Sequence, residues 1–192
     1  PAQTREEIVR IRDQEDVTVQ ITSSRNGPIV DELLPAAARS TGPVSLKWLG
    51  EQAGGWLTAL LDMGRSKTVV DFQEATRPWH VPTFSLMVAD TDGHIGFQAA
   101  GRVPIRRIAE RGYRPGWDPN HQWDGLIPFS SMPRLTDPSR GWIASANNRL
   151  AANDYPYPLS GCWSSGHRAA RIRQMLTEKE KQTVEDFQKM QL

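Results

Sequence analysis

Alternating apolar and polar residues predict β-strands in the first half of the chain. Residues 17–21 carry valine or isoleucine at every second position, which is the period of a half-buried strand. Asn26 and Gly27 then supply a turn, and Pro28 fixes the direction of its exit. A second strand is expected in "VSLKWL", residues 44–49. The clearest hairpin is "TFSLMVADTDGHIGFQAAG", residues 83–101, where "ADTDG" joins two apolar runs.

Helical spacing of apolar residues predicts four helices. Two lie at the end of the chain, from about Ser165 to Glu178 and over "TVEDFQKMQ" at residues 183–191. The other two lie between residues 55 and 79. One carries Trp56, Leu57, Leu60 and Leu61; the next follows Ser66 or Thr68, carries Val70, Phe72 and Ala75, and ends before Pro78.

Residues 102–138 are rich in proline, glycine and tryptophan and are expected to be mostly loop. Loops of this length are usually functional or extend over another surface. A further strand is predicted over "GWIASANNRL", residues 141–150. With no internal repeat, these elements predict an α+β fold in which residues 1–192 form a single domain or one piece of something larger.

Composition limits the partners that the chain can have. Of its 192 residues 38% are hydrophobic, which is enough for a core, and the net charge of +1 gives no overall field for nucleic acid or an anionic membrane. Arginine outnumbers lysine 18 to 5, which favours fixed bidentate contacts. No apolar run approaches the roughly 18 residues of a membrane span. No signal peptide is visible, although the chain begins at Pro1 and a signal could lie upstream.

The predicted strand over residues 141–150 ends in an unusual polar cluster. Asn147, Asn148 and Arg149 follow an apolar start. Asparagine is depleted in strands, and a buried carboxamide is unfavourable unless its donors and acceptor are paired. This cluster is therefore a candidate for a functional role.

The helix after residue 165 carries a second unusual residue. Arg168 falls on the same face as Ile172 and Met175, and it lies in the first turn, where a positive charge opposes the helix dipole. We therefore expect Arg168 to be mostly buried and to need an acceptor, which is a carboxylate, a carbonyl or a substrate. The alternative is a structural ion pair or an arginine that extends to solvent.

Other candidates for chemistry are weaker. Asp90 and Asp92 are more typical of an Asx turn than of a cation site. Cys162 is the single cysteine, so no disulfide forms within the chain; without a cationic neighbour in sequence it is expected to be a packed thiol rather than a nucleophile. Pro1 begins a polar, loop-like stretch and is a poor candidate for an amine catalyst. No zinc site is expected, because the histidines lack i, i+4 spacing and a partner cysteine: His80, His94, His121 and His167.

Six motifs follow one another over nearly the whole chain. They are the first strand with "RNGPIV", "DF-x-x-A-x-x-x-W", "ADTDGHIGF" followed by "GRVPIR", "WDGLIPF" at Trp123–Phe129, "ANNR", and "DYPYPLSGCWSSGHRAARI". In this order they resemble the penicillin acylase (penicillin amidase) family, amide hydrolases of the N-terminal-nucleophile class with an αββα sandwich. The resemblance is to the middle of the catalytic β chain, so residues 1–192 are expected to be a fragment of it.

The resemblance implies roles for the two unusual residues. In such enzymes an N-terminal serine, freed by self-cleavage, attacks an amide and uses its own α-amino group as the base. Asn147 matches the asparagine that holds the oxyanion from the end of a strand, and Asn148 would lie on the opposite face. Arg168, five residues after Trp163, matches an arginine that would hold the surroundings of the nucleophile, with Asn147 itself as a further group for it to hold.

The resemblance also implies partners. The serine would lie upstream of Pro1, so the chain alone is expected to be inactive and to need the α chain and the rest of the β chain of the precursor. The substrate would be an N-acyl compound, such as a penicillin or an acylated lactone, and a periplasmic or secreted location follows from the family alone. No cofactor is expected. Some members bind calcium and a carbonyl like that of Pro104 is one ligand, but the matching position near Tyr157 or Pro158 offers no carboxylate, although Asp154 is near.

Two other functions stay open. One is a catalytically silent module that binds a ligand or a partner through its tryptophan-rich loop. The other is nucleic-acid binding through the arginines from Arg168 to Arg173, which the balanced charge and the absence of a basic stripe disfavour. A lone piece of a layered sandwich would also expose apolar faces, so self-association is expected.

Overall fold

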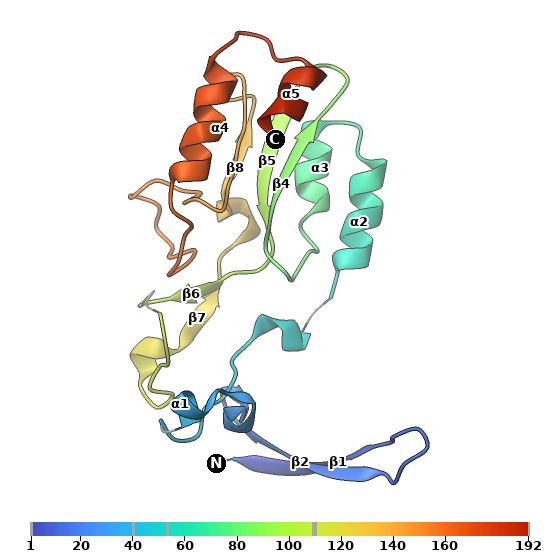
Figure 1. Cartoon of the computed structure of the whole chain (residues 1–192), viewed down its shortest axis with the longest axis vertical. Helices are drawn as coiled ribbons and strands as arrows, with labels where there is room; N and C mark the ends of the chain where they lie inside the picture. The colour runs from blue at the N-terminus through green and yellow to red at the C-terminus, as the bar shows by residue number, and fades with distance from the viewer. Residues whose placement is uncertain (1, 40, 53, 109–110, 192) are drawn as a thin grey trace.

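The computed structural model describes residues 2–39, 41–52, 54–108 and 111–191. Helices and antiparallel strands are mixed, which confirms the predicted α+β class. In Figure 1 a sheet with helices around it lies at one end of the molecule, and a long hairpin projects at the other. The elements in chain order are β1 (Gln3–Val9), β2 (Val17–Ser24), β3 (Gly27–Pro28), η1 (Asp31–Leu33), α1 (Ala36–Arg39), η2 (Leu49–Gln52), α2 (Trp56–Arg65), α3 (Val69–Ala75), β4 (Phe84–Ala89), β5 (Ile95–Ala100), β6 (Pro104–Arg106), η3 (Pro119–His121), β7 (Trp123–Leu126), η4 (Phe129–Ser131), β8 (Arg134–Thr136), α4 (His167–Thr177) and α5 (Val184–Met190).

The sheet in the body of the molecule is antiparallel and has the strand order β4-β5-β8. Strands β4 and β5 form the predicted hairpin, with Met87 opposite Phe97, and β8 adds to the other edge with Leu135 opposite Phe97. In Figure 1 helices α2 and α3 lie toward the β4 side of this sheet and α4 toward the β8 side. The sheet therefore forms the frame on which the helices and the later loops are arranged.

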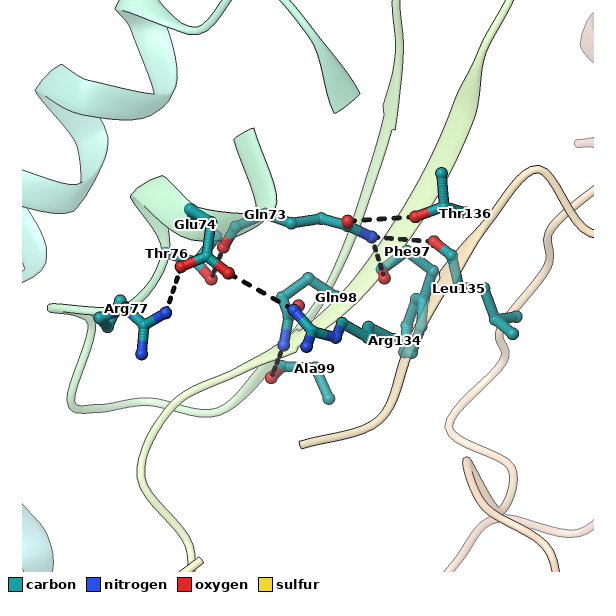
Figure 2. Close-up of polar contacts among 10 residues, drawn as sticks. All are labelled: Gln73, Glu74, Thr76, Arg77, Phe97, Gln98, Ala99, Arg134, Leu135 and Thr136. Atoms are coloured by element: carbon teal, nitrogen blue, oxygen red, sulfur yellow. Dashed lines mark hydrogen bonds and ion pairs between the residues drawn. The ribbon is translucent and has the colours of Figure 1, made fainter. Parts of the chain in front are cut away.

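Helix α3 packs closely on β5. A Cβ atom added to Gly96 would lie 2.3 Å from Val69 Cγ1, so the glycine allows the helix to approach the strand. Buried Gln73 fixes the contact: its Nε2 donates hydrogen bonds to the carbonyls of Phe97 (3.0 Å) and Leu135 (2.8 Å). Figure 2 shows this side chain reaching across both strands. One carboxamide therefore joins α3 to β5 and β8.

Two clusters of buried side chains form the interior. The main core consists of Phe97, Ala99, Val103, Ile127 and Met132. The second core consists of Ala59, Trp79 and Ala100, and it joins α2 to the sheet. Half-buried residues from the segment 143–159 pack against the main core, so this late loop is held by the sheet although it contains no helix or strand.

The helix predictions are confirmed, but the buried face is wrong in α2 and α3. Threonine caps begin α3 and α5 with the reciprocal capping-box bonds of Thr68 and Thr183. In α2 the predicted apolar face is exposed and Ala59 is buried instead. In α3 the buried positions are Val69 and Gln73. A sequence shows that an apolar face exists, whereas burial also depends on what is present to cover it.

Two predictions for strands and loops are wrong. The polar stretch "PAQTREE" at residues 1–7 was expected to be loop-like, but from Gln3 it belongs to strand β1, which pairs with β2. The stretch 44–49 has a single bridge between Ile29 and Ser45 instead of a strand. The described part of the region 102–138 is mostly loop, as predicted, and also contains three short strands. These short strands are paired over long sequence separations, which local patterns do not reveal.

Candidate active site around Asn147

Residues 141–150 do not form the predicted strand, but their position is fixed. Ile143 and Leu150 pack against the main core, and Ala146 is buried. Asn147 adopts a left-handed conformation with φ of 59°, which interrupts an extended chain. Asparagine accepts this conformation more readily than most residues do. The segment is therefore an anchored turn with Asn147 at its bend.

A backbone hydrogen bond ties this turn to the start of the last long helix. The amide of Ser164 donates to the carbonyl of Asn147 at 2.9 Å. Ser164 lies three residues before α4 begins, so the bond holds the end of the preceding loop against the turn. The Asn147 side chain itself is exposed.

Arg168 reaches back from the first turn of α4 to the same turn. Its Nη2 donates to the side-chain oxygen of Asn147 at 2.8 Å and to the carbonyl of Ala146 at 3.0 Å. The expected acceptors are thus present and are carbonyl oxygens. The expected burial is wrong, because Arg168 is exposed while Ile172 is half-buried and Leu176 is buried further along the helix.

The contact with Arg168 defines which way the Asn147 carboxamide points. A guanidinium only donates, so the atom that faces it must be the oxygen Oδ1. The Nδ2 group then projects away from the arginine, and it has no hydrogen-bond partner in the described part of the chain. This arrangement presents an amide donor whose orientation is set by a cation.

The neighbouring polar residues stabilise the turn locally. The Asn148 side-chain oxygen accepts a hydrogen bond from the amide of Ala146 at 2.9 Å, and Arg149 Nη1 donates to Asn153 Oδ1 at 2.5 Å. The expectation that Asn147 and Asn148 lie on opposite faces of a strand has no basis here, since there is no strand. Asn148 instead stabilises the turn through the hydrogen bond between its side-chain oxygen and the amide of Ala146.

The weaker candidates are structural or exposed. Asp90 accepts hydrogen bonds from the amides of Asp92 (3.1 Å) and His94 (2.9 Å), which confirms the Asx turn. His94 Nδ1 lies 2.8 Å from a carboxylate oxygen of Asp137, and this hydrogen bond raises the pKa of His94. Cys162 is exposed, so the expected packed thiol is wrong.

The residues around Pro104 do not fit a calcium ion. Pro104 lines a cavity of about 430 Å³ in which the charged lining residues, Lys47, Arg102 and Arg106, are all cations. Tyr157, near the expected carboxylate position, packs against the main core. Across the described ranges, no three His, Cys, Asp or Glu side chains are placed to hold a metal ion. That the chain holds no calcium stays a prediction.

The helices of the described residues were compared with the length and hydropathy of a membrane span. None of their helices is long and apolar enough to cross a bilayer.

The sequence singles out both residues of this site, and the family resemblance suggests Arg168 as a support for Asn147, but neither predicts the geometry that joins them. The left-handed turn at Asn147 and its bond to Ser164 were not foreseen. A signal was present, since consecutive asparagines are more typical of turns than of strands. The pairing over 21 residues, by contrast, depends on how both segments pack on the core.

The mixed helix and antiparallel-sheet fold of the chain is that of a segment of penicillin G acylase. The profile of the penicillin amidase family matches residues 1–192. The chain therefore belongs to the penicillin amidase family.

Known members are similar over the whole chain. The acyl-homoserine lactone acylase QuiP of Pseudomonas aeruginosa is 30% identical over 201 residues, which cover 100% of this chain and 24% of that protein. The penicillin acylase 2 proenzyme of Pseudomonas sp. (strain SE83) is 32% identical over 97% of this chain and 24% of its own length.

A solved structure confirms the fold. The thermostable penicillin G acylase from Alcaligenes faecalis matches with a TM-score of 0.73 at 18% identity, over 98% of this chain and 34% of that one. This chain thus spans about a quarter of the length of the curated relatives it matches, and it corresponds to a segment of larger acylases.

Proposed function

We propose that this chain is the part of an N-acyl amide hydrolase that supplies the oxyanion donor. In this proposal a serine at the N-terminus of the catalytic chain, in a part of the longer protein outside residues 1–192, attacks the carbonyl carbon of an N-acyl substrate. Negative charge then develops on the carbonyl oxygen. Asn147 donates a hydrogen bond from Nδ2 to that oxygen, and Arg168 holds the carboxamide in the orientation that makes this possible.

The contact between Arg168 and Asn147 carries the proposal. At 2.8 Å the guanidinium occupies the acceptor side of the carboxamide, which leaves the donor side directed outward. A donor whose orientation is fixed in advance stabilises charge without reorganisation at the moment of reaction. The relatives named as acylases support an amide substrate, and the family supports self-cleavage as the origin of the serine.

The test uses the longer protein that contains this chain and its serine. Asn147→Ala should lower kcat by about 10²–10³ with a much smaller change in KM, because the donor acts on charge that develops in the transition state. Arg168→Lys should give an intermediate loss, since lysine keeps the charge but not the planar geometry. The matched control is Arg171→Lys, one turn along, where the arginine contacts only Gln174.

Self-cleavage uses related chemistry, so each variant is first checked for complete processing by intact mass. Asn148→Ala is expected to reduce stability through the lost bond to the amide of Ala146, with kcat close to normal in the processed enzyme. If processed Asn147→Ala keeps a normal kcat while Asn148→Ala loses it, the donor has been assigned to the wrong asparagine.

Absence of any turnover by the processed wild-type protein, over a panel of N-acyl substrates, would instead favour the catalytically silent binding module. Residues 1–192 on their own should have no amidase activity. Turnover by the isolated chain would contradict the proposal directly.

A further inference from the structure

A large cavity, whose lining does not include Asn147, lies among segments that are distant in sequence. It measures about 1050 Å³, and its described walls come from residues 24–34, 41–47, 106–108, 111–123 and 159–162. In Figure 1 these segments meet around strands β6 and β7, between the sheet and the projecting hairpin. The cavity is at the upper end of the volumes that are common for small-molecule sites.

Positive charge gathers on one side of this cavity. Lys47, Arg106 and Arg111 line it, and its described lining contains no aspartate or glutamate. Arg111 is held by a bond from its Nε to the carbonyl of Gly161 at 3.3 Å. Lys47 and Arg106 make no ion pair within the described residues, so their charges are not neutralised there.

The two unpaired cations meet at a single aromatic ring. Lys47 Nζ lies 4.9 Å from the ring centroid of Trp123, and the guanidinium carbon of Arg106 lies 5.9 Å from the same centroid. A hydrogen bond of 3.0 Å to Gln122 Oε1 holds the Lys47 ammonium in this position. The indole of Trp123 thus has two positive groups beside it, and both residues line the cavity.

This arrangement disfavours the charged forms of both side chains. Burial lowers the pKa of Lys47, and the charge of Arg25 adds to the effect. Burial likewise lowers the pKa of Arg106, with a smaller contribution from Arg114. An anion bound at either group would act in the opposite direction, because an opposite charge favours the charged form.

The same wall contains polar atoms without partners. Asn26 Oδ1 and His121 Nδ1 are buried, and neither makes a hydrogen bond in the part of the chain that the structure describes. Both residues line the cavity. Both atoms lie beneath the surface, and Asn26 Oδ1 can only accept, so an anion would be held by the cations and not by these atoms.

The remaining lining is largely apolar. Aliphatic side chains such as Val30, Ile108 and Leu159 share the cavity with the exposed ring of Trp117. An inorganic anion would leave this surface in contact with water. A ligand that uses both sides has one negatively charged head and a hydrocarbon body.

We propose that this cavity binds an amphipathic organic carboxylate, with its head at the cations Lys47 and Arg106 beside Trp123 and its hydrocarbon part along the apolar wall. The site does not depend on the oxyanion donor. Its test needs no amidase activity, so failure of either proposal leaves the other standing.

Calorimetric titration of the chain with octanoate tests the proposal. Octanamide is the neutral analogue, and sodium phosphate tests the head group without the hydrocarbon. Octanoate should bind at least tenfold more tightly than both, since octanamide lacks the charge and phosphate lacks the apolar part. NMR should show the Trp123 indole N–H shifting during the octanoate titration.

The variants Lys47→Met and Arg106→Met should each weaken octanoate binding about tenfold, which corresponds to the loss of one charge-assisted contact. The matched control is Arg140→Met. Arg140 also lies over a tryptophan, 4.7 Å from the Trp142 centroid, but outside the cavity. Circular dichroism shows whether each variant is folded. The salt dependence of octanoate binding to the unaltered chain is a second test of the role of the cations, and it needs no variant.

Equal affinities for octanoate and octanamide, or an octanoate affinity insensitive to salt, would overturn the proposal because the cations would then play no part. Phosphate bound as tightly as octanoate would also overturn it, since the apolar wall would be irrelevant. So would the absence of octanoate binding to the folded chain.

Discussion

The side chain of Gln73 gives the most direct test of how the body of this molecule is held together. It is 3% exposed and makes three hydrogen bonds across secondary-structure elements. Two run from Nε2 to strand carbonyls, and the third is accepted by Oε1 from Thr136 Oγ1 at 3.2 Å. Gln73→Leu keeps a similar volume and removes all three, so the change isolates the hydrogen bonds.

The expected loss of stability follows from these contacts. A hydrogen bond contributes about 1 kcal/mol net to folding, so three contribute about 3 kcal/mol. The leucine regains about 1 kcal/mol through its apolar surface. The variant also leaves two buried carbonyl oxygens without this donor, and that lowers the stability further, by about 1–3 kcal/mol. Gln73→Leu should therefore lower the free energy of unfolding by about 3–5 kcal/mol.

Urea unfolding followed by circular dichroism measures this loss. Thr136→Val removes one of the three bonds and should lower stability by about 1 kcal/mol. In the double variant the two losses should not add, because both remove the same bond. Gln188→Leu is the matched control: it is an exposed glutamine on α5 and should change stability by no more than about 0.5 kcal/mol.

The charge variant Gln73→Glu separates hydrogen bonding from packing. A buried carboxylate cannot donate to the two carbonyls, whereas its protonated form can, so its folded pKa must lie above the ordinary value. The variant should then be less destabilised at pH 4 than at pH 7. A loss below about 0.5 kcal/mol for Gln73→Leu, or a Gln73→Glu stability that does not change with pH relative to the unaltered chain, would refute the role of the bridge.

Three further predictions concern other parts of the chain. The hydrogen bond with Asp137 raises the pKa of His94. The stabilisation that this pair gives is therefore present below the ordinary histidine pKa and is lost as the pH rises through the raised value. Asp137→Asn should flatten this pH dependence of the melting temperature and lower the His94 pKa in an NMR titration. Thr183→Ala removes the cap of α5 and should lower the free energy of unfolding in urea by about 1 kcal/mol. Leu61→Lys, at an exposed apolar position of α2, should leave stability within about 0.5 kcal/mol and reduce self-association in sedimentation experiments, and unchanged association would show that this face is not involved.

Local signals were sufficient where an element depends on its own residues. The hairpin of β4 and β5 was predicted from alternation and a turn because its two strands are adjacent in sequence. Helices α3 and α5 begin at threonines whose side chains bond to the third residue of the helix, and this is readable from the sequence.

Local sequence patterns did not predict features that depend on a segment distant in sequence. Strand β8 is three residues long and pairs with β5 across a long stretch of chain, as in the pairing of Gly96 with Thr136, which are 40 positions apart. The burial of Ala59 rather than of the larger side chains in α2 depends on Trp79 and Ala100, which approach that small residue. A hydrophobic pattern identifies apolar surface, but the partner that covers it lies elsewhere.

The candidate site shows both cases together. Its two residues stood out because each was chemically out of place, a carboxamide in an apparent strand and a cation at the start of a helix. The family resemblance suggested Arg168 as a support for Asn147 but not the geometry of the contact: Arg168 donates to the side-chain oxygen of Asn147, whose backbone carbonyl is tied to Ser164. The 20 residues between them form a loop that packs on the main core through Leu150 and Leu159. Because the core fixes both ends of this loop, the arginine can remain exposed and still hold the carboxamide, so orientation rather than burial is what this contact contributes.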